Sequence, residues 1–313
     1  MLFMKVRVKV LSDFLAIPFL LLAGLLLTSA ASLAANYHVP LDEQSWDFEQ
    51  VEALRCVLTR NVQGLGEVSL VAGAGQTSSI MLQTMQMRNL RGVARFILRP
   101  APWNRRDPGE ELGVTMKDTG TGLKFDLDIS PLEWMSKLTH SFWLFLEVYG
   151  SRPEPLISLE VPTTGINFQI SELTDCLIGL LPYNFEQLEK TVLYFEPGKV
   201  FLSERQQLKL ADIANYLQWD GTVIGLSIDA HADSSGYRLD NLKLSKQRAE
   251  VVYDYLLSKS VKPTQVLHLR HHGQRYPVAD NGTRKGRQLN RRVVITLKRD
   301  VQRDFVQSAL ADP

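Results

Sequence analysis

This chain of 313 residues has almost no surplus of charge. It contains 35 lysines and arginines against 34 aspartates and glutamates, for a formal net charge of +1. No global field is therefore available to recruit nucleic acid, and we expect no nucleic-acid partner. Basic residues do cluster locally, with no acid among them, in a stretch that we interpret as a solvated loop and strand edge: Arg284, Lys285, Arg287, Arg291, Arg292, Lys298 and Arg299.

Long hydrophobic runs are also missing, except near the N-terminus. The apolar stretch Phe14–Leu27 follows Lys5, Arg7 and Lys9, and small residues lead up to Ala34. This order is typical of a secretory signal peptide over residues 1–34, with the mature protein beginning near Ala35. A membrane anchor is the alternative, but the stretch falls short of the roughly 20 residues needed to span a bilayer. Because no cysteine stands at the expected cleavage point, we expect no lipid attachment of the exported mature protein.

Cysteine is scarce, since only Cys56 and Cys176 are present. In an oxidising compartment, a pair with no thiol left over predicts one disulfide. It would close a loop of about 120 residues, for which chain-entropy models give on the order of 4–5 kcal/mol. The alternative is two buried free thiols.

Short strand-length segments dominate the first half, and turn-forming residues separate them. In Leu123–Ile129, apolar residues alternate with Lys124, Asp126 and Asp128, as in a half-buried strand. We predict an antiparallel β domain over residues 35–182 that ends in a helix over residues 171–181. The other expected strands are Ser79–Met87, Gly92–Leu98, Ser141–Tyr149 and Ile166–Ile170.

After Pro182 the pattern changes to alternating strands and helices. Ser203 with Gln206 predicts a capping box, and Leu210, Ile213, Ala214 and Leu217 form one apolar helical stripe. A second helix should run to about Ser258. With strands at 191–198, 223–230, 266–270 and 291–297, the order is βαβαββ, which predicts an α/β sandwich over residues 183–300 with helices on one face of a mixed sheet. Residues 301–313 would form a tail. The expected fold class is thus a two-domain α+β protein.

Two charged residues stand out in the second half. Asp233 follows the strand at 223–230, and Arg248 lies on a helix, where it shares one face with Asn241 and Leu244. Carboxyl ends of strands in open α/β layers commonly bind ligands. An ordinary ion pair between Asp233 and Arg248 is the alternative. We expect a neighbouring apolar stripe to dock on the sheet: Leu242, Ala249, Val252, Tyr253 and Leu256.

The region Thr191–Lys298 resembles the OmpA-like peptidoglycan-binding domain. The matching positions are Ala232-Asp233 with Gly236, Asn241 with Leu244-Ser245, Arg248-Ala249, Pro277 with Asn281, and Asn290-Arg291-Arg292. Ala232 stands where the family usually has threonine.

This resemblance implies binding of diaminopimelate, the zwitterionic side chain of a cell-wall stem peptide. Asp233 would accept from its ammonium, and Arg248 would offer its planar fork to its carboxylate. The resemblance also implies that Asn241 and Leu244 line the pocket, with Phe195 and Arg292 nearby. No nucleophile stands beside a base, so we expect binding without catalysis and no cofactor.

The first half narrows the resemblance to the MotY family of flagellar-motor proteins. The resemblance rests on a signal peptide without lipid attachment, on a β-rich domain of about 140 residues, and on a cysteine near each end of that domain. It rests also on the segments 185–196 and 277–295. The resemblance implies a periplasmic T-ring component that supports stator assembly. Its partners would be a MotX-like protein, the flagellar basal body and, indirectly, the stator B subunit. A general OmpA-like anchor of the envelope, unrelated to flagella, is the alternative.

A metal site is a further alternative. Asp229, His231 and Asp233 alternate along one strand, and three more imidazoles follow at His268, His271 and His272. The histidine spacing matches no helical zinc motif, and the OmpA-like pattern already accounts for Asp233. We therefore predict no metal.

Overall fold

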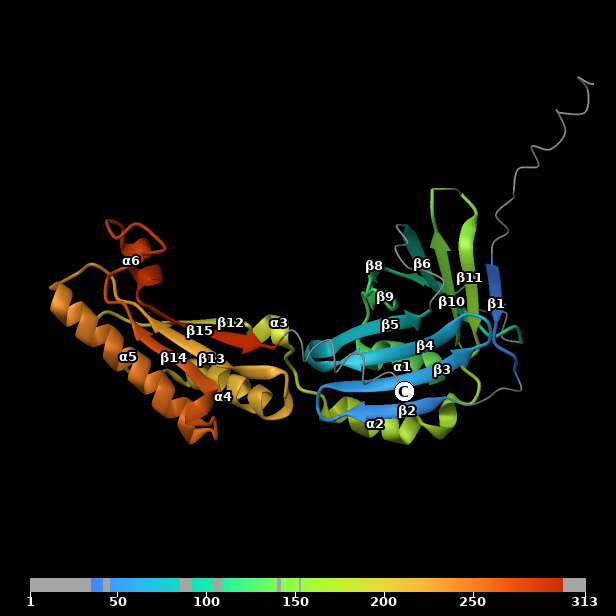
Figure 1. The fold of residues 1–313 in the computed structure, drawn as a ribbon, viewed down its shortest axis with the longest axis horizontal. Helices are drawn as coiled ribbons and strands as arrows, with labels where there is room; N and C mark the ends of the chain where they lie inside the picture. Colours follow the sequence, from blue (N-terminus) through green and yellow to red (C-terminus); the bar gives the residue numbers. More distant parts are fainter. Residues whose placement is uncertain are drawn as a thin grey trace, which may run out of the picture.

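The computed structural model describes residues 35–41, 46–84, 92–103, 109–139, 142–151 and 153–300. The predicted signal peptide and C-terminal tail lie outside these residues, as does the end of the predicted strand 79–87. The chain forms two parts that lie side by side, an N-terminal β-rich part and a C-terminal α/β part (Figure 1). None of the helices in the described ranges is long and apolar enough to cross a membrane.

Two sheets build the N-terminal part. The five-stranded sheet has the spatial order β1-β11-β10-β6-β7, and the six-stranded sheet has the order β2-β3-β4-β5-β9-β8. The first contains β1 (Ala35–His38), β6 (Val93–Pro100), β7 (Glu110–Leu112), β10 (Phe142–Tyr149) and β11 (Pro155–Val161). The second contains β2 (Asp47–Val51), β3 (Arg55–Val62), β4 (Gly66–Gly73), β5 (Thr77–Gln83), β8 (Val114–Asp118) and β9 (Gly122–Leu127).

Strand pairing in this part is antiparallel, as predicted, apart from β1, which runs parallel to β11. The alternation seen in the sequence sets the faces of β9, because Leu123 and Phe125 are buried while Lys124 and Asp126 are partly exposed. Side chains from both sheets share one core, which also receives Trp134 of α1 (Pro131–Thr139).

One predicted strand of this part is wrong. Residues 166–170 form a 3₁₀ turn, η3 (Ile166–Phe168), and the start of α2 (Ile170–Gly179). Gly165 adopts a left-handed conformation (φ 85°) that turns the chain, and Phe168 is 79% exposed rather than paired in a sheet. The helix predicted at 171–181 is confirmed as α2.

A disulfide joins Cys56 of β3 to Cys176 of α2, across a separation of 120 residues. The predicted bond is therefore present, and it ties the last helix of the N-terminal part to one of its first strands. Both sulfurs belong to the buried core.

The C-terminal part contains a four-stranded mixed sheet of order β12-β15-β13-β14. Strand β13 is parallel to β14 and antiparallel to β15, which also pairs antiparallel with β12. The helices and strands of the C-terminal part are α3 (Phe185–Leu188), β12 (Lys190–Tyr194), α4 (Glu204–Trp219), β13 (Val223–Ala230), α5 (Arg238–Ser258), η4 (Pro263–Gln265), β14 (Val266–His271), α6 (Arg284–Asn290) and β15 (Arg292–Arg299).

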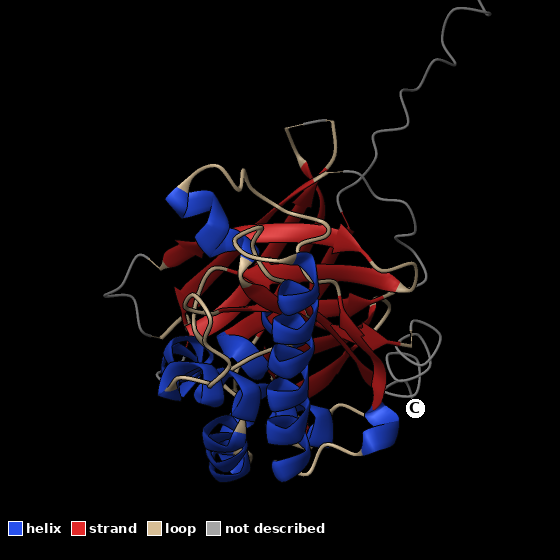
Figure 2. Ribbon diagram, turned by 90° about the vertical axis from the view of Figure 1, so that its left-hand side faces the viewer, coloured by secondary structure: helices blue, strands red, loops and turns tan. Residues whose placement is uncertain are grey.

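Helices α4 and α5 cover one face of this sheet, as predicted (Figure 1). Turned by 90°, the molecule shows most of its helices in the lower half of the view and most of its strands behind and above them (Figure 2). The predicted stripe of α4 is buried from Leu210 to Leu217, and Gln206 closes the capping box by accepting from the Ser203 amide at 2.8 Å. On α5, Ala249, Val252 and Leu256 are buried, but Leu242 is exposed, so its predicted docking on the sheet is wrong.

The two parts meet through an apolar contact beside the chain's crossover, where main-chain hydrogen bonds hold the last residues of the β-rich part. The Leu181 amide donates to the Ala53 carbonyl at 2.9 Å, and the Leu181 carbonyl accepts from the Gly75 amide at 2.9 Å. Ala74 of the β-rich part packs into the same apolar cluster as Leu188 and Leu193 of the other part. The parts are therefore held together by more than a covalent linker.

Candidate functional site

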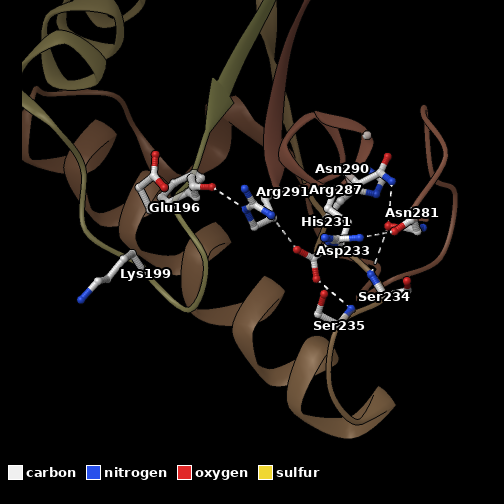
Figure 3. A network of polar contacts seen from close by, with 12 residues as sticks. Glu196, Lys199, His231, Asp233, Ser234, Ser235, Asn281, Arg287, Asn290 and Arg291 are labelled. Atoms are coloured by element: carbon white, nitrogen blue, oxygen red, sulfur yellow. Dashed lines mark hydrogen bonds and ion pairs between the residues drawn. The ribbon is translucent and has the colours of Figure 1, made fainter. Parts of the chain in front are cut away.

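Asp233 lies in the loop between β13 and α5, where the sheet ends. Its side chain is only 10% exposed and forms an ion pair with Arg291, with 2.8 Å between Asp233 Oδ2 and Arg291 Nη1. The Ser235 amide donates to Oδ1 at 2.9 Å. Both bonds are visible in Figure 3, where Arg291 lies between Glu196 and Asp233.

Arg248 of α5 is completely buried and uses all three nitrogens of its guanidinium on main-chain carbonyls. The acceptors are Lys199 at 2.9 Å from Nε, His231 at 3.3 Å from Nη1, and Glu196 at 3.1 Å from Nη2. The guanidinium also lies over the Phe195 ring, 5.0 Å from its centroid. Arg248 thus connects α5 to the turn after β12 and to the end of β13.

The ordinary ion pair considered between Asp233 and Arg248 is not formed, since Asp233 pairs with Arg291 in the part of the chain that the structure describes. Arg291 belongs to the quoted Asn290-Arg291-Arg292 motif, yet sequence analysis gave it no role. Its Nε also donates to the Phe195 carbonyl at 3.0 Å, so Arg291 joins the ends of β12 and β13.

Burial and neighbouring charges shift the pKa values of Arg248 and Asp233. Burial and, after it, the nearby charge of Arg291 lower the pKa of Arg248 to about 10, and the charge of Asp233 opposes both. Burial alone would raise the pKa of Asp233, but hydrogen bonds from Arg291 and Ser235 outweigh it and hold that pKa below its usual value. Asp233 is therefore ionised at neutral pH.

Asn241, near the start of α5, is buried and supports a neighbouring loop. Its Nδ2 donates to Gln274 Oε1 at 3.0 Å, while Ser245 Oγ accepts from the Gly273 amide at 2.9 Å. Gly273 has φ +56°, and a Cβ there would lie 3.2 Å from the Leu242 amide nitrogen, so glycine permits this close approach to the helix. Leu244 is half-buried one turn before Arg248.

A pair of asparagines from the motif fastens the loop before α6 against the Asp233 turn. Asn281 Oδ1 accepts from the Ser234 amide at 3.2 Å and from Asn290 Nδ2 at 2.9 Å (Figure 3). Asn290 Oδ1 in turn accepts from the Val278 amide at 2.8 Å. These side chains position the loop through its main chain.

Arg292 points elsewhere. Its Nη2 donates to the Tyr276 carbonyl at 3.1 Å, and its Nη1 is buried without a hydrogen bond. Its charge contributes, after burial, to lowering the pKa of His231 to about 4. Arg292 therefore belongs with His231 and not with the Asp233–Arg291 pair.

The residues of the metal alternative do not converge. Asp229 pairs with Arg270 and His272, both at 2.7 Å, and His272 stacks on His231 at 4.8 Å. Asp233 faces Arg291 instead. Within the described ranges, no group of three or more His, Cys, Asp or Glu side chains could hold a metal ion.

Comparison with known proteins agrees with this division into two parts. Residues 37–182 match the MotY N-terminal domain, and residues 194–291 match the OmpA family. The Vibrio parahaemolyticus sodium-type flagellar protein MotY is 28% identical over 289 residues, which is 87% of this chain and 93% of that protein. The Escherichia coli putative lipoprotein YfiB is 32% identical over 152 residues, or 46% of this chain and 94% of YfiB.

Other relatives match only about a third of the chain. Outer membrane porin F of Pseudomonas aeruginosa is 32% identical over 100 residues, and the match spans 28% of its length. Among solved structures, the peptidoglycan-associated lipoprotein of Burkholderia pseudomallei aligns with a TM-score of 0.32 and 25% identity, over 34% of this chain and 89% of that one. The C-terminal domain of Helicobacter pylori MotB aligns with a TM-score of 0.34 and 22% identity, over 39% and 95%.

Proteins of both families are structural and not enzymatic. The two family matches follow one another along the chain, and the full-length likeness to a flagellar protein covers both. The chain therefore combines a MotY N-terminal domain with a C-terminal OmpA-family domain.

Proposed function

We propose that this protein is a periplasmic component of the flagellar motor that anchors to peptidoglycan. The observation that carries the proposal is the succession of the two family matches in one chain, together with the Vibrio flagellar relative that spans 87% of it. In this proposal the protein belongs to the T ring and supports stator assembly around the basal body.

In this proposal the two parts have different binding partners. Residues 35–182 would contact the basal body and a MotX-like protein, and residues 183–300 would hold the cell wall. The stator B subunit would be an indirect partner. The packing of Ala74 into the apolar cluster that contains Leu188 and Leu193 supports this proposal, because a force on one part would pass to the other through this contact.

The wall ligand would be diaminopimelate, bound at the group around Asp233 and Arg248. Asp233 is ionised and could accept from the ligand's ammonium. Asn241, Leu244 and Phe195 would shape the pocket, and Arg292 would support the adjoining loop through the Tyr276 carbonyl. Arg248 is fully buried and each of its three nitrogens donates to a carbonyl, so a ligand carboxylate could bind it only through the second N–H of Nη1 or Nη2.

Deletion and complementation test the proposal. Cells without the gene should lose swimming while retaining flagellar filaments, and the intact gene should restore motility. An Asp233→Ala gene should restore it poorly at equal protein abundance. A deletion strain that swims normally but has a weakened envelope would favour the alternative of a general peptidoglycan anchor.

A further inference from the structure

Helix α2 lies on the outside of the β-rich part and buries only one of its faces (Figure 1). Leu173, Cys176 and Leu177 belong to the core, and the disulfide fixes the helix to β3. On its flank, Thr174 Oγ1 donates to Met135 Sδ of α1 at 4.0 Å. The remaining face of α2 is exposed to solvent, on a helix that is held firmly in place.

Four residues form the exposed stripe of α2 and of the η3 turn that leads into it, here called the α2 stripe: Phe168, Glu172, Asp175 and Ile178. Their spacing of four, three and three residues places them on one side of a helix. Phe168 is 79% exposed and Ile178 is 77% exposed. On the neighbouring helix α1, Leu132 is 62% exposed. Large apolar side chains that gather on one exposed face mark an interaction site.

The charge of the α2 stripe is negative and unbalanced. Neither Glu172 nor Asp175 forms an ion pair with any residue that the structure describes. Residues 153–189 contain no Lys, Arg or His that could neutralise them from the same stretch of chain. On α1, Lys137 pairs with Glu110 instead. Two exposed carboxylates therefore lie between two exposed apolar side chains.

This combination of charge and apolar surface specifies the kind of partner. A membrane surface that carries anionic lipids would be repelled by the carboxylates. A polypeptide segment with lysines or arginines beside apolar side chains would complement both the negative charge and the apolar surface. Because the disulfide already fixes α2, little of the binding free energy would be lost in ordering the helix.

We propose that the α2 stripe, together with Leu132, is the docking surface for a basic, partly apolar segment of a flagellar partner protein. Lysines or arginines of that segment pair with Glu172 and Asp175, and its apolar side chains cover Phe168 and Ile178. This inference rests on the proposed function, since it locates the contact between the β-rich part and the basal body. The surface lies in the other part of the molecule from Asp233, so both contacts can form at once.

Co-sedimentation of the full-length mature protein with basal bodies, isolated from a strain that lacks the gene, tests the inference. Wild-type protein should pellet with the basal bodies. The double variant Glu172→Lys with Asp175→Lys should bind about 10-fold less or weaker, because like charges then face each other. Raising NaCl from about 0.05 M to about 0.5 M should weaken wild-type binding, since salt screens exposed charges.

The matched control is Glu250→Lys with Asp254→Lys, which reverses two exposed acids on α5 in the other part of the molecule. It should bind basal bodies as wild type does. If the first double variant does not fold by circular dichroism, Glu172→Gln with Asp175→Asn replaces it, and it too should weaken binding. All folded variants should pellet with isolated sacculi at the wild-type level.

The apolar contribution has its own pair of variants. Ile178→Ser should weaken binding to basal bodies without lowering the melting temperature, because the side chain is already exposed. Leu208→Ser, at a leucine of α4 that is 61% exposed, should bind as wild type does.

Wild-type binding by the folded variants at Glu172 and Asp175 would overturn the inference and leave the proposed function standing. Self-association of the wild type that these variants abolish, measured by sedimentation velocity, would also overturn it, because the stripe would then bind a second copy of this chain. Absence of wild-type binding to basal bodies would overturn both the inference and the flagellar part of the proposed function.

Discussion

At the scale of single residues, Arg248 is a buried charged side chain whose hydrogen bonds all go to main-chain carbonyls. Three carbonyls from two segments accept from its guanidinium, and no carboxylate among the described residues forms an ion pair with it. If the side chain were shortened, the Lys199 and His231 carbonyls would lose this donor, whereas the Glu196 carbonyl would still accept from the Lys199 amide at 3.1 Å. An unsatisfied buried carbonyl costs about 1–3 kcal/mol. The residue therefore determines the shape of the Glu196–Lys199 turn.

Arg248→Ala should lower the free energy of unfolding by about 2–4 kcal/mol and weaken wall binding. Arg248→Lys should rescue neither, because one ammonium cannot reach three carbonyls in the geometry of a planar fork. Urea unfolding measures the first effect. Lys246→Ala, at an exposed position on the same helix, is the control and should change stability by less than about 0.5 kcal/mol. Wild-type stability in Arg248→Lys would contradict this role.

His231 gives the fold a pH dependence of predictable sign. Burial and the charge of Arg292 lower its pKa from 6.5 to about 4 in the folded protein. Between these values the unfolded chain binds a proton that the folded chain does not, so stability is complete above pH 6.5 and falls as the pH drops towards 4. His231→Gln should reduce this fall. Equal slopes for both proteins in urea unfolding between pH 7 and pH 5 would show that His231 does not cause it.

At the scale of elements, long periodic segments were predictable and local exceptions were not. The stripe from Leu210 to Leu217 predicted α4 because its spacing suits one helical face. Ile166, Phe168 and Ile170 alternate like a strand, yet the left-handed Gly165 turns them into a 3₁₀ segment. Helix α1 was missed, although Ser130 before Pro131 is a usable start signal: its hydroxyl accepts from the Glu133 amide at 3.3 Å.

The candidate site was only partly predictable for a similar reason. A motif indicated Asp233 and Arg248, but the partner of Asp233 lies 58 residues away at Arg291. Residues that far apart are brought together by the order of strands in the sheet. Sequence spacing shows which residues share a helix face, and it does not show which side chain from another element will meet them.

Gly286 is the position on which α6 most depends. A Cβ there would lie 1.9 Å from the Asp280 carbonyl oxygen, and the Gly286 amide donates to Thr283 Oγ1 at 2.9 Å. Gly286→Ala should therefore displace the loop that carries Asn281 and cost about 1–3 kcal/mol in thermal unfolding. Gly221→Ala, where no atom lies within 4 Å, should be tolerated. Equal melting temperatures for the two variants would refute this account of α6.

At the scale of the whole molecule, two cores meet at a small apolar contact, where Ala74 of the β-rich part packs into the cluster of the α/β part. The disulfide Cys56–Cys176 closes the β-rich part just before the chain passes through Leu181 into the α/β part. Its position is far along the chain from Asp233 and Arg291. Stability and wall binding should therefore respond differently to its loss.

Cys176→Ser should lower the free energy of unfolding by about 2–5 kcal/mol and reduce the steady-state abundance of the protein in cells. Wall binding per folded molecule should change little, because the bond acts on the unfolded chain and on the β-rich part. Quantitative blotting and binding of purified protein measure the two effects. A loss of binding as large as the loss of abundance would mean that the disulfide also shapes the α/β part.

The central claim is that Asp233 binds the cell wall, and co-sedimentation of purified protein with isolated sacculi tests it most directly. Wild-type protein should pellet with sacculi. Asp233→Ala, shown to be folded by circular dichroism, should remain in the supernatant, because the ligand's ammonium and Arg291 both lose their acid at an expected cost of roughly 2–5 kcal/mol. Folded Asp233→Ala protein that pellets at the wild-type level would contradict the account.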